Sequence, residues 1–511
     1  MMKTKTNSGN SIKRRDFIGG VTTAAIGLTI VPREVLGGRG YIPPSDKINV
    51  AYIGTGTQGL SEMPNLLKIP DAQIVAVCDP QKEARGYYDW SPKGLLNKLR
   101  ETTGDTTWTP GGDNKIPGGR DCGQQVVERY YAKQTGKNYK CAAYSDFREM
   151  YEKEKGIDAV KIMATDHLHG VMAAAAMKRG IHMTMHKPIA NRLEEGFQVV
   201  EMAKKSELIT HLIPWESNGS MEQVLAWIKG GVIGKLKEVH NWSNRPVWPQ
   251  YAELPTDKPE LPQGFDWDLW LGPEAVRPYH PHYTNMVFRG WYDFGGGAMA
   301  DMGHYSLWTV FEGLELVNPV YIEPTRSHVC GHKPDASAYR IENNFSFPYA
   351  GSVRFKYPKN NWRDEVELIW SDGGIHPSVP AEFYDNNKEL PIEGLMFKGE
   401  SGIIMSSQFT LKDPYVLSGD MKLAEQLKKE VSYDRGSGIE KFIQAVKNNQ
   451  QTDGSFRKAW PITEAVNLYA TALRSGKNLK YDAAKREITN VPEVNKYLKR
   501  EYRKGWSLEE I

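Results

Sequence analysis

A short segment near the start of the chain combines the local signals of a strand, a glycine-rich turn and a helix. Residues 47–53 (KINVAYI) alternate in polarity and are rich in β-branched side chains, which is typical of a strand. They lead into GTGTQG at residues 54–59 and then into a helical pattern. Gly54 allows the tight turn, Gly56 lets backbone N–H groups approach a pyrophosphate, and Gly59 lets the helix sit close to the strand. The segment therefore predicts a Rossmann dinucleotide-binding unit.

A second predicted strand supplies the acidic residue that such a unit requires. Residues 72–78 form an apolar run that ends at Asp79, about 20 residues past the last glycine. A carboxylate at this place can accept hydrogen bonds from the adenosine ribose hydroxyls, which favours NAD over NADP. The cofactor-binding residues expected in this region are Gly54, Gly56, Thr57, Gln58, Gly59 and Asp79.

The remaining sequence predicts two domains. Residues 81–123 carry turn signals and little apolar periodicity, which indicates a long insertion beside the cofactor cleft. Strand and helix patterns otherwise alternate over residues 45–214, so we expect an α/β fold with a parallel sheet that helices cover on both faces. Longer extended runs separated by Pro- and Gly-rich loops predict an α+β domain with a mostly antiparallel open sheet over residues 215–480, and residues 481–511 form a C-terminal tail.

The first 38 residues predict an export signal. Arg14 and Arg15 form a twin arginine, and residues 17–31 are uncharged and largely apolar. This pattern resembles a Tat leader. The apolar stretch is shorter than the roughly 20 residues that cross a bilayer, so stable membrane insertion is not expected. We therefore expect residues 1–38 to be a Tat signal peptide and the protein to be periplasmic. Export in the folded state suits a protein that must collect a cytoplasmic dinucleotide first.

Charge and cysteine content narrow the range of partners. The formal net charge of +3 over 511 residues gives no reason to expect nucleic acid as a partner. Pairing of Cys122 with Cys141 is conceivable in an oxidising compartment, but their spacing does not decide it. His328, Cys330 and His332 alternate in what could be a strand, as zinc ligands can. No fourth ligand has recognisable spacing, so we expect no metal.

Three later motifs, together with the glycine-rich turn and Asp79, resemble the Gfo/Idh/MocA oxidoreductase family. They are ATDHLH at 164–169, HKP at 186–188 and GGGAMADMGH at 295–304. The resemblance covers about residues 45–480 and implies an NAD(P)-dependent enzyme. The family usually has Glu-Lys-Pro at the position of HKP, so the usual cofactor contact of that glutamate is in doubt here. The resemblance adds Thr165, His169, His186 and Lys187 to the cofactor-binding residues.

The same motifs supply the candidate catalytic residues. Lys187 follows a predicted buried strand and precedes Pro188, so it would project into the cleft as a compact charge able to polarise a substrate oxygen. Asp301, His304 and Tyr305 would share one face of a helix, at i, i+3 and i+4. The family's acid and base are an Asp and a His four residues apart, whereas this chain has Tyr305 at the fourth position and His304 one residue earlier. Both residues therefore remain candidates for the base.

Aromatic and polar residues of the second domain indicate the substrate class. Trp residues are frequent between residues 215 and 308, and flat aromatic faces suit the apolar face of a sugar ring. The same Trp side chains could instead fill the core between the domains. The predicted substrate-binding residues are Trp215, Arg245, His282, Arg289 and Trp291.

These observations predict an exported NAD(P)-dependent oxidoreductase that acts on a carbohydrate or polyol hydroxyl and retains its cofactor tightly. We also expect a homo-oligomer formed through the C-terminal sheet. One alternative is a glycoside hydrolase that uses NAD for transient oxidation and elimination. Another is a sugar-binding sensor without turnover. A keto-sugar product, a released aglycone and binding alone would distinguish the three.

Overall fold

The computed structural model describes residues 43, 46–83, 87, 91, 93–110, 116–213, 220–246, 248, 250–406, 410–429 and 437–511. The predicted export signal and Trp215 lie outside the described residues. No helix in the described part of the chain combines the length and apolar character needed to cross a membrane. Residues Lys47–Ile511 form one compact unit.

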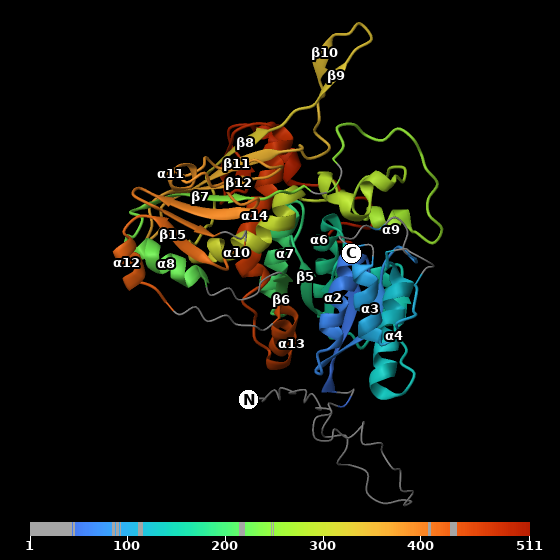
Figure 1. The fold of residues 1–511 in the computed structure, drawn as a ribbon. Helices are drawn as coiled ribbons and strands as arrows, with labels where there is room; N and C mark the ends of the chain where they lie inside the picture. Colours follow the sequence, from blue (N-terminus) through green and yellow to red (C-terminus); the bar gives the residue numbers. More distant parts are fainter. Residues whose placement is uncertain are drawn as a thin grey trace, which may run out of the picture. The chain divides into compact units, whose positions relative to one another are not determined.

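The first domain is built on a six-stranded parallel sheet with strand order β3-β2-β1-β4-β5-β6 (Figure 1). Successive side chains of a strand point to opposite faces, so the apolar residues of β1 feed two separate cores. Val50 and Tyr52 pack with α2, α3, α4 and α13, whereas Ala51 and Ile53 pack with α5, α6 and α7. Helices on both faces explain why these strands are apolar throughout.

The strands of this sheet are β1 (Ile48–Ile53), β2 (Ala72–Cys78), β3 (Ala142–Tyr144), β4 (Ala159–Ile162), β5 (His182–His186) and β6 (Thr210–Ile213). The helices around it are α2 (Thr57–Leu67), α3 (Gly94–Thr103), α4 (Arg120–Thr135), α5 (Phe147–Lys153), α6 (Asp166–Met177), α7 (Leu193–Ser206) and α13 (Gly438–Asn448).

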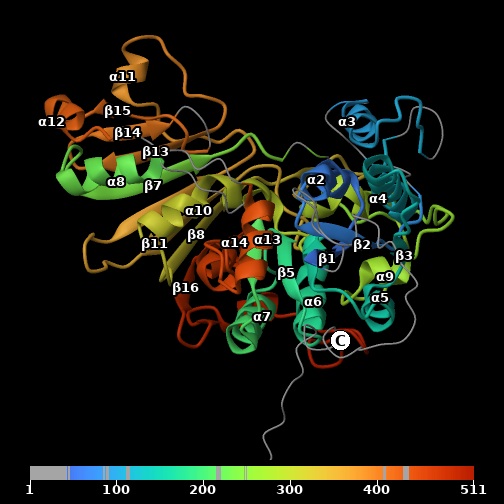
Figure 2. The same cartoon turned by 90° about the horizontal axis from the view of Figure 1, so that it is seen from below.

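The second domain contains a nine-stranded sheet of order β15-β14-β13-β7-β12-β11-β8-β16-β17. Neighbouring strands are antiparallel except for β7 and β12, which are parallel. The predicted fold class, a Rossmann domain followed by a mostly antiparallel sheet domain, is therefore confirmed. Helices α10 and α14 pack on one face of the sheet, and α14 lies between β8 and α7 of the first domain (Figure 2). The opposite face carries charged pairs such as Arg354 with Glu367.

The strands of the second domain are β7 (Leu236–Trp242), β8 (Tyr321–Arg326), β11 (Gly351–Tyr357), β12 (Val366–Ser371), β13 (Gly394–Gly399), β14 (Ile403–Ser406), β15 (Pro414–Ser418), β16 (Leu479–Asp482) and β17 (Glu487–Ile488), with a separate hairpin of β9 (Cys330–His332) and β10 (Ala338–Arg340). Its helical segments are α8 (Ser220–Gly230), α9 (Trp267–Leu271), η3 (Pro281–Tyr283), η4 (Asn285–Gly290), η5 (Met299–Gly303), α10 (His304–Gly313), α11 (Ala381–Tyr384), α12 (Met421–Gln426), α14 (Phe456–Ser475) and η6 (Pro492–Leu498).

The predicted insertion, residues 81–123, contains a helix that the sequence did not reveal. Helix α3 buries Leu95 and Leu99 against the first domain, although its remaining residues are mostly polar. Helix α4 begins at Arg120, within the last positions of the predicted insertion. A short amphipathic stripe inside a turn-rich segment gives a weak periodic signal, which explains why the sequence predicted only a loop here.

The C-terminal residues 481–511 return to the first domain and tie it to the second. Arg500 is 2 % exposed at its side chain, and its guanidinium pairs with Glu195 of α7 at 2.9 Å and with Glu274, which follows α9, at 2.7 Å. Tyr502 donates a hydrogen bond to Glu195 at 2.7 Å. A buried charge is stable only when its partners are in place, so this segment fixes two regions that are far apart in the sequence.

A buried carboxyl on α14 gives the fold a testable pH dependence. Glu464 is 3 % exposed and accepts a hydrogen bond from the Tyr481 hydroxyl at 3.0 Å. Burial raises the pKa of Glu464 to about 7, from about 4.5 in the unfolded chain. The native state therefore holds this proton more tightly, and the associated stability is present below pH 4.5 and lost as pH rises through 7.

We expect Glu464→Gln, which keeps an oxygen acceptor without the charge, to raise the unfolding free energy at pH 8 by at least about 1 kcal/mol. The gain should shrink toward zero at pH 5. Thermal unfolding of both proteins at four pH values between 5 and 8 measures the difference. A difference independent of pH would show that the charge of Glu464 does not control stability.

Candidate active site

A cavity of about 500 Å³ joins the glycine-rich turn to the predicted catalytic residues. Gly54, Gly56 and Gly59 line one part of its wall, and Lys187 and Tyr305 line another. It lies outside the carboxyl ends of the parallel strands, where open α/β sheets bind their ligands. One cavity therefore holds both the nucleotide-binding signature and the candidate chemistry.

The glycine-rich turn has the shape that a pyrophosphate requires. Gly54 has φ +90°, and an added Cβ there would lie 2.5 Å from the carbonyl carbon of Met163. An added Cβ at Gly59 would lie 2.1 Å from the Gly54 carbonyl oxygen. Helix α2 begins at Thr57 without a side-chain cap, so its first N–H groups are available to an anion. Thr57 and Gln58 also line the cavity, so this turn fits a dinucleotide.

Asp79 fixes the same turn to the end of β2. Its Oδ2 atom accepts hydrogen bonds from the backbone N–H of Thr55 at 2.8 Å and from the Thr55 hydroxyl at 3.2 Å, and its Oδ1 atom accepts one from Gln81 N–H at 2.8 Å. Burial raises the pKa of Asp79, and these hydrogen bonds oppose the shift. A carboxylate has about four acceptor positions, so one remains for a ribose hydroxyl. Asp79 lines the cavity and can serve both purposes.

Lys187 and Asp301 form the central ion pair of the cavity. Lys187 follows β5, is 1 % exposed at its side chain, and donates to Asp301 Oδ1 at 2.8 Å. Burial lowers the pKa of Lys187 to about 8, although Asp301 opposes the shift. Burial would raise the pKa of Asp301, but the charges of Lys187 and Arg289 hold it well below its usual range. The pair therefore places an ammonium that can release its proton near neutral pH beside a permanent carboxylate.

Two arginines complete this charged cluster. The Nε atoms of Arg245 and Arg289 each lie 3.4 Å from a carboxylate oxygen of Asp301. Arg289 also donates to Asp166 at 2.9 Å, and Asp166 is fully buried and accepts the Gly296 N–H at 3.0 Å. Both arginines, which the sequence predicted as substrate contacts, line the cavity. Asp166 was not predicted, although it lies inside the ATDHLH motif.

The structure separates His304 from its two helical neighbours. Asp301 and Tyr305 line the cavity, whereas His304 is fully buried and lies apart from the lining. Its Nδ1 lies 3.2 Å from the Ala300 carbonyl oxygen, and burial lowers its pKa to about 3, so the ring is neutral. Residues 299–303 form a π-helical turn, whose wider i to i+5 spacing changes the phase expected of an α-helix.

His186, the departure from the family motif, contacts Tyr305. Its Nε2 atom lies 3.0 Å from the Tyr305 hydroxyl, and Lys187 Nζ lies 5.1 Å from the centre of the Tyr305 ring. His169, in contrast, directs both ring nitrogens to backbone carbonyls, of Pro188 at 2.6 Å and Ala164 at 3.0 Å, and does not line the cavity. His169 therefore connects two loops, while His186 and Thr165 face the cavity.

The predicted substrate aromatics are largely part of a core. Trp291 is 1 % exposed and donates from Nε1 to the His282 carbonyl oxygen at 2.6 Å. The His282 ring stacks on Tyr251, and neither Trp291 nor His282 lines the cavity. Trp248 and Trp270 line it instead. The sequence could not assign each Trp, because the packing of several aromatic segments decides which ring faces the cavity.

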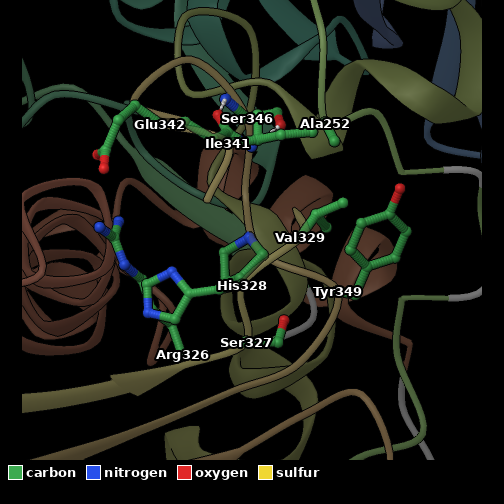
Figure 3. A pocket seen from close by; sticks show the side chains of 11 residues that line it. Ala252, Arg326, Ser327, His328, Val329, Ile341, Glu342, Ser346 and Tyr349 are labelled. Carbon is green, nitrogen blue, oxygen red and sulfur yellow. Dashed lines mark hydrogen bonds between the residues drawn. The ribbon is translucent and has the colours of Figure 1, made fainter. Parts of the chain in front are cut away.

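A smaller pocket of about 30 Å³ lies at the base of the β9–β10 hairpin, with His328 and Arg326 on its wall (Figure 3). The hairpin projects from the nine-stranded sheet (Figure 1) and carries Cys330 and His332, which are exposed. Across the described ranges, no three His, Cys, Asp or Glu side chains gather as a metal site would require. The structure holds all four cysteines, including Cys122 and Cys141, as thiols.

Two family models of one family match the chain. Residues 125–213 match the oxidoreductase family's NAD-binding Rossmann fold, and residues 221–332 and 420–508 match its C-terminal alpha/beta domain. The chain belongs to the Gfo/Idh/MocA oxidoreductase family. Its first domain is therefore the NAD-binding Rossmann domain of that family.

Individual relatives are distant. A glycosyl hydrolase family 109 protein of Akkermansia muciniphila is 24 % identical over 38 % of this chain and 33 % of its own length. An oxidoreductase of Bacillus subtilis, YfiI, is 26 % identical over 29 % of this chain and 36 % of its own length. A glycosyl hydrolase family 109 protein of Shewanella sp. MR-4 is 23 % identical over 44 % of this chain and 45 % of its own length. The chain thus spans between a third and a half of the length of these curated relatives.

Two solved structures match the chain at low identity and with TM-scores below 0.5. The WlbA dehydrogenase from Chromobacterium violaceum, in complex with NADH and UDP-GlcNAcA, has a TM-score of 0.49 and 13 % identity, with 86 % of this chain and 97 % of that one covered. The aldose-aldose oxidoreductase from Caulobacter crescentus, complexed with glycerol, has a TM-score of 0.45 and 12 % identity. The match covers 85 % of this chain and 99 % of that one.

The buried ion pair leads to a first prediction for the site. Lys187→Ala should lower kcat at least about 100-fold, because it removes the charge that can polarise the substrate oxygen. Arg245 and Arg289 still compensate Asp301, so the fold and the bound dinucleotide should be retained. Steady-state kinetics and the dinucleotide content of the purified variant measure both effects. Near-normal turnover would remove Lys187 from the mechanism.

The separation of His304 from Tyr305 leads to a second prediction for the site. Tyr305→Phe should reduce kcat at least about 100-fold because it removes the hydroxyl that reaches the cavity. His304→Asn should cost less than about tenfold in kcat and act mainly on thermal stability, since its ring is buried and bonded to the backbone. The two variants are compared at saturating substrate. The reverse order of effects would restore His304 as the base.

Proposed function

We propose that this chain is an exported NAD(P)-dependent oxidoreductase that acts on a carbohydrate or polyol hydroxyl and retains its cofactor. The observation that carries the proposal is the single cavity that joins the glycine-rich turn to Lys187, Asp301 and Tyr305. Oxidation of a hydroxyl requires a dinucleotide and a group that takes the hydroxyl proton, side by side in a water-poor site. This cavity provides residues for both.

The chain's own residues account for the proton. When bound, the dinucleotide supplies the acceptor for the hydride that leaves the substrate carbon. Lys187, held by Asp301 at 2.8 Å, polarises the substrate oxygen, and the Tyr305 oxygen receives the hydroxyl proton as its own phenol proton passes to a neighbouring acceptor. Arg289, which Asp166 holds at 2.9 Å, and Arg245 orient neighbouring hydroxyls. Of the two candidate bases from the sequence, we propose Tyr305, because His304 does not line the cavity.

The mixed lining of the cavity supports a polyhydroxylated substrate. It combines charged groups with apolar rings such as those of Trp248 and Trp270. Sugars present hydroxyls at their edges and an apolar face to aromatic rings, which matches this composition. The remaining acceptor position of Asp79 supports NAD rather than NADP, since a ribose 2′-hydroxyl can donate to it and a phosphate cannot.

Export and cofactor retention are proposed together. The twin arginine within residues 1–38 supports Tat export to the periplasm, where free dinucleotide is scarce. Tyr87, within the predicted insertion, lies 3.1 Å from the position of a Cβ on Gly56 and lines the cavity. A side chain in this place can cover the bound dinucleotide. A further proposal is that copies of the chain associate through the charged face of the nine-stranded sheet.

A second candidate function is a glycoside hydrolase that oxidises, eliminates and re-reduces its substrate. It is favoured by the relatives named glycosyl hydrolase family 109 proteins, which match 38 % and 44 % of this chain. With a retained cofactor, both candidate enzymes return the dinucleotide to its starting state after a full cycle. The oxidoreductase does so by coupling the oxidation of one sugar to the reduction of another, and the hydrolase by re-reducing its own substrate. Their products differ, because only the hydrolase releases an aglycone.

We expect a dinucleotide to co-purify with the protein in about one equivalent. A retained cofactor requires nanomolar affinity, which corresponds to about 12 kcal/mol of binding free energy. Denaturation of the purified protein and assay of the supernatant for NAD and NADP measures this content. An empty protein that works only with added NAD, and releases stoichiometric NADH, would contradict retention.

The substrate is tested on the same preparation with a panel of free sugars, polyols and aryl glycosides, whose products are identified by mass spectrometry. A keto-sugar supports the oxidoreductase, and a released aglycone supports the hydrolase. A protein that carries dinucleotide and binds sugars without converting any of them would be a sensor, and the proposed activity would be wrong.

A further inference from the structure

A chain of polar side chains connects Tyr305 and His186 of the cavity wall to the buried Lys161. Lys161, in the middle of β4, is 1 % exposed at its side chain and donates to Glu62 Oε2 at 2.8 Å. The other oxygen of Glu62 accepts from Gln58 at 2.9 Å and lies 3.7 Å from His186 Nε2. His186 Nε2 lies 3.0 Å from the Tyr305 hydroxyl. Four elements, β4, α2, β5 and α10, each contribute one residue to this chain.

We propose that His186 takes up the proton of Tyr305 during substrate oxidation and that Glu62, held by Lys161, stabilises the imidazolium that forms. This inference rests on the proposed function, because it names residues that act behind Tyr305 in that reaction. The substrate O–H bond breaks as its proton moves to the Tyr305 oxygen. The original Tyr305 O–H bond breaks as its proton moves to His186 Nε2. The pair of steps leaves Tyr305 neutral and adds one proton to His186.

The charges around His186 suit this role. Burial, and next the charge of Lys187, lower the pKa of His186 well below its ordinary value, so the resting ring is neutral and can accept a proton. Glu62 favours the protonated ring, whereas Arg289 and His169 oppose it. Burial opposes ionisation of Glu62, but Lys161 and then His186 lower its pKa to about 2, so Glu62 is a carboxylate at working pH. The imidazolium would thus form beside a negative charge that is already in place.

The arrangement also explains a costly feature of the fold. An ion pair inside a parallel sheet domain costs desolvation energy, and apolar residues of similar size are often as stable. Lys161 and Glu62 are therefore poorly explained by stability alone. Glu62 lies 3.7 Å from His186 and accepts a hydrogen bond from Gln58 at the start of the cofactor-binding helix, which connects the ion pair to the site. In this chain, His186 stands where the family usually has a glutamate.

Two substitutions separate the electrostatic role from a structural one. Glu62→Gln keeps an oxygen for Lys161 but removes the charge that stabilises the imidazolium, so kcat for oxidation should fall at least tenfold while KM changes less than threefold. Lys161→Met leaves Glu62 charged and unpaired, so it should be the less stable variant and yet keep a kcat at least tenfold above that of Glu62→Gln. A structural role alone would make activity follow stability.

The pH dependence of activity gives a second, independent test of the relay. His186 must be unprotonated to accept, so activity falls at low pH as the ring becomes protonated. Glu62→Gln should move this acidic limb to lower pH, and Lys161→Met should move it to higher pH. The matched control is Glu149→Gln, which breaks an exposed pair with Lys153 on α5 and should change neither kcat nor the limb. Shifts of the acidic limb in the same direction in Glu62→Gln and Lys161→Met would overturn the proposal.

A measurement without turnover keeps the test separate from the proposed function. The relay requires the resting His186 ring to carry its proton on Nδ1, so that Nε2 accepts from Tyr305. Nitrogen NMR of the purified protein with ring-labelled histidine, assigned by comparison with His186→Gln, reports the tautomer at pH 7. A proton on Nε2 would overturn the relay even if sugars are oxidised. Failure to convert any sugar, with Nδ1 protonated, would instead contradict the proposed reaction.

Discussion

The buried ion pair between Lys187 and Asp301 is the interaction on which the site depends. Lys187 comes from the end of a strand in the first domain, and Asp301 from a π-helical turn in the second, so the pair forms only when the two domains are packed together. Two buried charges are tolerated because each has several partners: Arg245 and Arg289 also approach Asp301. The packing of the two domains is therefore required for the geometry of the candidate active site.

The same principle of compensated burial recurs around the cavity and away from it. Asp166 holds Arg289, Lys161 holds Glu62, and Arg500 holds Glu195. Each pair joins segments that are distant in the sequence, and each leaves a defined set of donors and acceptors at its position. Burial strongly lowers the pKa of both His304 and His186, so both rings are neutral at rest. The two histidines differ in their surroundings: His186 lies beside Tyr305 and Glu62, whereas His304 Nδ1 lies beside a backbone carbonyl.

Much of the fold was predictable because its signals are local. The GTGTQG turn between two apolar strands specified a Rossmann unit, and Lys187 at the end of a strand was expected to reach the cleft, where it lies. Helix α3 escaped prediction because few of its residues are apolar. Trp291 and His282 were predicted to bind substrate. The structure places Trp291 in an aromatic cluster and stacks the His282 ring on Tyr251, and sequence composition does not tell which face of a ring packs inward.

The sequence by itself determined the fold class, the nucleotide-binding turn and the residue types of the site, because strand alternation, glycine spacing and motif order depend on neighbours along the chain. Tertiary structure alone decided which residues meet. The π-helical turn placed Tyr305 rather than His304 in the cavity wall, and packing of α2 against β4 and β5 brought Glu62 to Lys161 and His186. Such contacts arise between segments about 100 or more residues apart, and no local pattern encodes them.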